Sequence, residues 1–243
     1  SAAPTTIALE NVEFNNAKLR YLDEDIDLRL IVFINHLEIT GGYQAAVFES
    51  TISGKGILAD LTFEDYDLAD SLSIATHGSL TNQHGSTKIN IKELLLQDVA
   101  FTGSGELREN TQRWKLSSKD TRLHQWLRII PKAWQPNIDL AAIGGEADAQ
   151  FDISLDDDKQ EVLATAKLKD AALNLEEKHI LLQNANGEIA FRYATTAKQS
   201  KSHLSLKNIK ANTRTGDLAL NLEIENLQMP QVATNGSFNI QLE

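Results

Sequence analysis

Apolar and polar residues alternate along most of this chain, which is the pattern of β-strands that bury one face. The clearest run extends from Ile26 to Ile34. Leu28, Leu30 and Val32 would share one face of this strand, while Asp27 and Arg29 begin the other. The same alternation predicts five more apolar residues on one face of later strands, namely Phe151, Ile153, Leu218, Leu220 and Leu222.

Alternating runs follow one another at spacings of roughly ten to sixteen residues. Sequential antiparallel strands need only short turns, so this spacing predicts an antiparallel meander. Asn15-Asn16 is expected to join two short strands, and Asn186-Gly187 and Asn235-Gly236 are favourable dipeptides for type I′ hairpin turns. We expect about sixteen strands, and a chain so rich in strand belongs to the all-β class.

One stretch near the middle of the chain has helical periodicity instead. Its apolar residues fall at i, i+3, i+4 and i+7, the spacing of one helical face. These residues are Leu123, Trp126, Leu127 and Ile130. Asp120 and Thr121 are residue types that cap helix N-termini, and Pro131 and Pro136 would end the helix. We therefore expect one short amphipathic helix that packs on the sheet.

The helix and the prolines divide the chain into three parts. We expect an N-terminal β-meander block over residues 5–118, a helix with a proline-rich connector over 119–137, and a C-terminal β-meander block over 138–243. Together the three parts are expected to form one continuous elongated domain.

Composition narrows the range of partners. The chain has 23 Lys and Arg against 34 Asp and Glu, a net charge of −11, so we expect no nucleic-acid partner, which would need a basic face. It has no cysteine, which excludes disulfides and thiolate metal sites. No window approaches eighteen consecutive apolar residues. Ser1-Ala2-Ala3-Pro4 lacks both an initiator Met and an apolar signal region, so we expect a fragment whose parent carries a membrane segment.

Motifs that would carry chemistry are weak. His77 and His84 would meet across a hairpin, but two solvated turn histidines explain them better than a metal site. Asp23-x-Asp25-x-Asp27 begins like a calcium loop but lacks the following Gly and the bidentate Glu. Gly103-Ser104-Gly105 lacks the flanking residue of a nucleophile elbow. We therefore predict no catalytic residue, no metal and no cofactor.

A family resemblance comes from the order of these features. Residues 120–131 read Asp-Thr-Arg-Leu-His-Gln-Trp-Leu-Arg-Ile-Ile-Pro, a short amphipathic helix that runs into a proline. Residues 145–153 then read Gly-Glu-Ala-Asp-Ala-Gln-Phe-Asp-Ile. Residues 7–21 and 164–173 add a strand pair on each side. The pattern spans nearly the whole chain and resembles the AsmA-like proteins of Gram-negative envelopes.

The resemblance implies a long, twisted antiparallel sheet that curls into an open groove with an apolar floor. It also implies a periplasmic protein, anchored in the inner membrane through a segment absent from this chain. Its function would be non-catalytic, in phospholipid transport and in outer-membrane assembly and integrity. The eight apolar residues named first would then line the groove, where they would contact the acyl chains of a phospholipid or another lipid.

Two other functions stay open. Alternating strands most often line the closed core of a β-sandwich, which would indicate an adhesion or scaffold module with two packed sheets. Asp and Glu are abundant, and a catalytic pair of carboxylates is a spatial arrangement that sequence spacing does not reveal. A carboxylate-dependent glycan hydrolase would require two close acids in a cleft.

Overall fold

The computed structural model describes residues 6–24, 27–63, 66–69, 71–130, 142–175, 180–196, 199–227 and 229–240. Contacts divide the chain into two compact units. The first unit comprises Ser1–Asn110 and Arg128–Gln135, and the second comprises Thr111–Leu127 and Pro136–Glu243. The strand at residues 111–122, which we expected in the N-terminal block, therefore belongs to the second unit.

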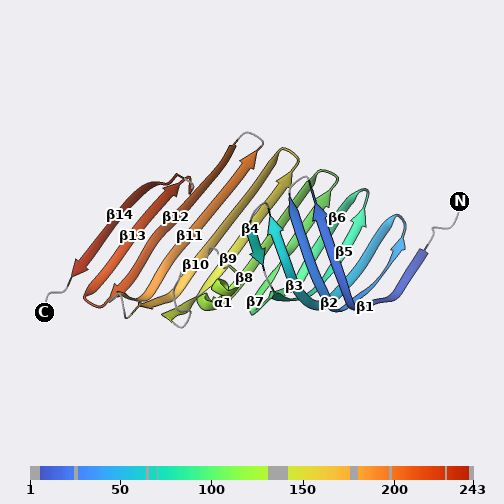
Figure 1. Ribbon diagram of the computed structural model, residues 1–243, viewed down its shortest axis with the longest axis horizontal. Helices are drawn as coiled ribbons and strands as arrows, with labels where there is room; N and C mark the ends of the chain where they lie inside the picture. Colours follow the sequence, from blue (N-terminus) through green and yellow to red (C-terminus); the bar gives the residue numbers. More distant parts are fainter. Residues whose placement is uncertain are drawn as a thin grey trace. The chain divides into compact units, whose positions relative to one another are not determined.

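The first unit is an antiparallel sheet in which consecutive strands lie side by side. Its strands are β1 (Thr6–Asp23), β2 (Leu28–Gln44), β3 (Val47–Phe63), β4 (Tyr66–Ala69), β5 (Leu72–Gln83), β6 (Ser86–Leu96) and β7 (Val99–Arg108). The strand order is β1-β2-β3-β5-β6-β7, and the short β4 pairs with the end of β3 (Figure 1).

The second unit repeats this architecture with seven strands. These are β8 (Thr111–Arg122), β9 (Ile143–Asp156), β10 (Lys159–Leu175), β11 (Ile180–Thr196), β12 (Gln199–Thr213), β13 (Gly216–Glu225) and β14 (Gln231–Ile240). They follow one another in chain order across the sheet. In each unit the described strands form an open antiparallel sheet with a linear strand order. This confirms the predicted all-β meander.

Several predicted turns lie inside continuous strands, so the described residues form fourteen strands in place of the expected sixteen or so. Asn15-Asn16 lies within β1, Asn186-Gly187 within β11 and Asn235-Gly236 within β14. The turn predictions were therefore wrong. Residues that favour turns also suit β-bulges, since both need a residue that tolerates positive φ. Asn16, for example, has a φ of 53° in a strand that continues to pair with β2.

Strands β8 to β12 each contain a residue with positive φ at the level where the pairing register shifts, and β11 contains a second one, Gly187. The other residues are Asp120 (φ 49°), Gly145 (φ 88°), Asp170 (φ 48°), Asn184 (φ 52°) and Asn208 (φ 52°). A bulge bends its strand and increases the local twist. Because the bulges lie on adjacent strands, they bend the sheet of the second unit from β8 to β12.

The buried core of the second unit lies at this bend and is made of small residues. Ala171, Ala185 and Ala211, on three adjacent strands, are buried and pack together. Leu123 of the helix packs against this alanine cluster, as do Leu168 and Leu182 of the sheet.

The predicted helix is present as α1 (Leu123–Ile129), directly after β8. Asp120 and Thr121 do not cap it, because both remain in β8. The backbone N–H of Arg122 instead donates to Oε1 of Gln125 at 3.1 Å, which is half of a capping box. Pro131 and Pro136 lie outside the described residues.

Candidate functional site

In the first unit, the three predicted groove residues of β2 lie on one face of the sheet. Leu30 is opposite Leu61 of β3, and Val32 is opposite Leu58. Directly paired residues of antiparallel strands project from the same face. Leu28, Leu30 and Val32 are half-buried, so this apolar face is neither a closed core nor fully in solvent.

The opposite face of β2 is polar at the same level. Arg29 forms an ion pair with Asp60, with Nε 2.9 Å from Oδ2, and donates to Oγ1 of Thr62 at 3.2 Å. Asp27 is exposed. The predicted assignment of Arg29 to the face away from the leucines therefore agrees with the structure, whereas Asp27 lies in the turn before β2.

Glycines on β3 leave a hollow of about 120 Å³ in the apolar face. Gly54 and Gly56 line it together with apolar side chains of the two neighbouring strands, among them Val32 and Ile34 of β2 and Ile74 of β5. A Cβ at Gly56 would collide with the carbonyl oxygen of Phe33, so the backbones approach too closely for any other residue. We identified no role for these glycines from the sequence, although Gly-x-Gly inside an alternating run is a signal of close backbone approach.

In the second unit, the remaining predicted residues belong to a continuous apolar surface. Phe151 of β9 begins a row of directly paired residues, which continues through Ala164, Phe191, Leu204 and Ile224 on the next four strands. A neighbouring row contains Ala149, Ala166, Ile189, Leu206 and Leu222. Ile153, Leu218 and Leu220 extend this face.

None of the eight predicted groove residues is fully buried. Among the described residues, five of the eight buried apolar side chains are alanines. A sandwich core would bury its large aliphatic side chains, whereas here Phe151, Ile153, Leu218, Leu220 and Leu222 all stay half-buried. Their apolar surface can therefore contact another molecule.

Helix α1 covers part of the apolar face of the second unit. The ring centroids of Trp126 and Phe151 are 5.9 Å apart, and Leu123 contacts the alanine cluster. Leu127 is half-buried at the end of the helix, and Ile130 lies one residue beyond it. The helix thus occupies a surface that would otherwise be continuous with the row that begins at Phe151.

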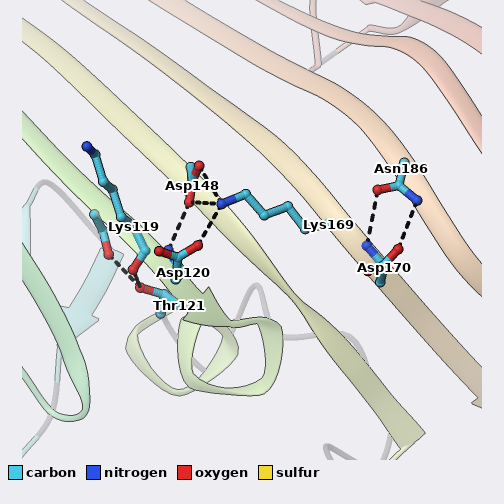
Figure 2. Close-up of polar contacts among 8 residues, drawn as sticks. Lys119, Asp120, Thr121, Asp148, Lys169, Asp170 and Asn186 are labelled. Carbon is cyan, nitrogen blue, oxygen red and sulfur yellow. Dashed lines mark hydrogen bonds and ion pairs between the residues drawn. The ribbon is translucent and has the colours of Figure 1, made fainter.

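The other face of the second unit carries a cluster of Asp120, Asp148 and Lys169 (Figure 2). Nζ of Lys169 on β10 donates to Oδ1 of Asp148 at 2.8 Å and to Oδ1 of Asp120 at 2.6 Å. Oδ1 of Asp148 also accepts the backbone N–H of Asp120 at 2.8 Å. The Lys169 cluster therefore ties together the bulges of β8, β9 and β10.

The charges of this cluster oppose acid catalysis by its carboxylates. The N–H of Asp120, and then Lys169, hold the pKa of the Asp148 carboxyl below its usual value. Asp120, and then Asp148, raise the pKa of Lys169. A glycosidase pair needs one carboxyl with a raised pKa, so two acids bridged by a lysine suit the pairing of strands better than hydrolysis.

Histidines and acidic residues do not converge elsewhere in the described part of the chain. There, no three His, Asp or Glu residues lie close enough to hold a metal ion. His77 lies in β5, and His84 forms the β5–β6 turn with Gly85.

The described residues include no helix with the length and hydrophobicity needed to cross a bilayer. Comparisons with protein-family models, with curated proteins and with solved structures find no match to this chain.

Proposed function

We propose that the apolar face of the sheet binds the acyl chains of a phospholipid or another lipid, and that the protein is a non-catalytic module for lipid transport in the cell envelope. The observation that carries this proposal is the half-buried state of Leu28, Leu30, Val32, Phe151, Ile153, Leu218, Leu220 and Leu222. The periplasmic location, the role in outer-membrane assembly and the inner-membrane anchor of a longer parent follow from the resemblance to AsmA-like proteins.

The chemistry of this face supports a hydrocarbon ligand. Its rows in the second unit consist mainly of Ala, Leu, Ile and Phe, and the charged side chains of the same strands, such as Asp152 and Glu223, project from the other face. Covering ten CH₂ groups would contribute roughly 8 kcal/mol before the entropic cost of ordering the chain. This is enough for binding without any specific polar contact.

The repetition of equivalent apolar positions supports movement along the face. Row after row presents apolar side chains, and the hollow of about 120 Å³ beside Val32 is small compared with an ordinary ligand pocket of at least about 300 Å³. A chain bound to such a surface meets no deep energy minimum. Such a surface therefore favours transport of a lipid over its storage.

A charged side chain on this face tests the proposal. We expect Leu220→Glu to reduce the uptake of a fluorescent acyl-chain phospholipid at least tenfold, because it places a charge in the path of the acyl chain. Asn221→Glu, one residue away on the exposed face, is the matched control and should bind normally.

Urea unfolding of the same two variants separates binding from folding. Leu220 is half-buried, so the glutamate should keep contact with water and lower the free energy of unfolding by no more than about 2 kcal/mol. Unchanged uptake by a folded Leu220→Glu variant would refute lipid binding here. Complete unfolding would instead favour the closed core of a scaffold module.

A further inference from the structure

The outer edge of β1 is a long strand edge with an exposed apolar face. Among the described residues β1 pairs only with β2, which leaves its other edge open over eighteen residues. Six of its large apolar side chains are 36–54% exposed, namely Ile7, Leu9, Phe14, Leu19, Tyr21 and Leu22. Long open edges of this kind are sites for pairing with another strand.

The part of β1 from Val12 to Leu19 is symmetric about Asn15 and Asn16, whereas the register shift between Leu9 and Val12 has no counterpart in the second half. Phe14 is opposite Leu37 of β2 and Ala17 is opposite Ile34, and both partners line the same hollow. Phe14 and Ala17 therefore share the apolar face, because the positive φ of Asn16 reverses the alternation between them. Val12 and Leu19 lie on this face at the next positions out. An antiparallel copy of β1, rotated about the Asn15–Asn16 bond, would place apolar residues opposite apolar residues.

One charged pair of β1, Glu13 and Lys18, is complementary under the same rotation, whereas Glu10 would lie opposite Tyr21 and Arg20 opposite Asn11. Glu10 and Glu13 lie in its first half, and Lys18 and Arg20 lie in its second half. The rotation places Glu13 opposite Lys18 of the other copy. Within one copy, Glu13 faces Glu38 of β2, a like-charge pair, and Lys18 faces Phe33 with Nζ 5.4 Å from the ring centroid. Within the described residues, none of these four charged side chains of β1 forms an ion pair.

We propose that β1 is a homodimerisation edge, on which a second copy of this chain pairs antiparallel about Asn15 and Asn16. The pairing would join the two apolar faces into one surface and give the carboxylate of Glu13 a cationic partner. It does not depend on lipid binding, since it rests on the edge, the symmetry and the charges of β1 alone.

Cysteine crosslinking tests the register, because the chain has no cysteine of its own. Val12 of one copy should lie opposite Leu19 of the other, whereas two copies of residue 12 would lie about 23 Å apart along the strands. We expect a disulfide-linked dimer when Val12→Cys and Leu19→Cys proteins are mixed and oxidised, and none from either variant alone. Absence of the mixed dimer, or equal crosslinking of each variant with itself, would overturn the proposal.

Charge reversal tests the complementarity by sedimentation of the purified chain over a range of concentrations. Glu13→Lys or Lys18→Glu alone should weaken dimerisation roughly tenfold, because each occurs twice in the dimer. The double variant should recover the affinity of the natural chain. Lys92→Glu on β6 changes the net charge by the same amount as Lys18→Glu and should have no effect. A chain that stays monomeric at 100 µM would contradict the proposal, as would a dimer whose affinity does not change with these charge reversals. The alternative would then be that the edge of β1 pairs with a different protein.

Discussion

The aromatic rings of Trp126 and Phe151 lie with their centroids 5.9 Å apart and their planes inclined at 40°. Trp126 is the central apolar residue of α1, and Phe151 begins the apolar row of the second unit. This contact, together with that of Leu123, fixes the helix on the sheet. The surface proposed to bind lipid is therefore bounded by an element of the same chain.

Removal of the Trp126 ring should release the helix from the sheet. Because Trp126 is only half-buried, we expect Trp126→Ala to lower the free energy of unfolding by about 2 kcal/mol, less than the cost at a fully buried site. Urea unfolding of Trp126→Ala, Phe151→Ala and the double variant should yield a coupling of about 1 kcal/mol. A coupling of zero would mean that the rings contribute independently.

The bulge of β9 should depend on one of two adjacent glycines. Gly145 has a φ of 88°, and a Cβ there would meet the backbone of Asp170 and Ala171. We expect Gly145→Ala to lower the free energy of unfolding by about 3 kcal/mol. Gly144→Ala is the control, since its Cβ would meet only Cβ of Ala172 at 3.6 Å, and it should cost less than about 1 kcal/mol. Equal effects in chemical unfolding would show that the bulge conformation is unimportant.

The turn between β2 and β3 should be easy to stabilise. Ala45 and Ala46 have φ values of 49° and 66°, which alanine adopts at a cost. Asn-Gly is the preferred dipeptide for such a turn, so Ala45→Asn with Ala46→Gly should raise the free energy of unfolding by about 1 kcal/mol. Ala100→Gly, inside β7, should lower it by a similar amount. A destabilised Asn-Gly variant would contradict the turn conformation.

The Lys169 cluster should stabilise the fold over a defined pH range. The pKa of Asp148 is lowered, so its contribution is complete above the ordinary value of 3.8 and is lost as the pH falls below it. The pKa of Lys169 is raised, so its contribution is complete below the ordinary value of 10.5 and is lost at higher pH.

Lys169→Met should therefore reduce stability between about pH 5 and 9 and lose most of this effect at pH 3. Urea unfolding at these pH values measures the difference from the natural chain. Lys201→Met, an exposed lysine of β12, should show little difference at any pH. A Lys169→Met effect that is equally large at pH 3 would rule out the ion pairs as its origin.

The faces of the strands were predictable because one simple period governs them. Arg29 alternates with Leu28 and Leu30, and the structure places it on the face opposite to theirs. Leu123 and Trp126 were likewise predicted to contact the sheet from helical spacing, and both do.

The bulges were not predictable from the same period. Asp170 and Asn208 follow Lys169 and Lys207 inside strands, and Lys119 precedes Asp120 in the same way. A turn and a bulge both need a residue with positive φ, and only pairing with the neighbouring strands decides between them. The role of Lys169 depends on contacts among three strands, and no spacing along the chain reveals such contacts.

Photo-crosslinking to lipid tests the central claim most directly. A photoreactive amino acid would be placed at Val32, Ile153 or Leu220 on the apolar face, and at Arg29, Asp152 or Asn221 on the polar face. Each purified protein would be irradiated with vesicles of phosphatidylethanolamine and phosphatidylglycerol, and the attached lipid identified by mass spectrometry. The account predicts lipid adducts from the first three positions and few or none from the second three. Equal adducts from both faces, or none from either, would contradict it.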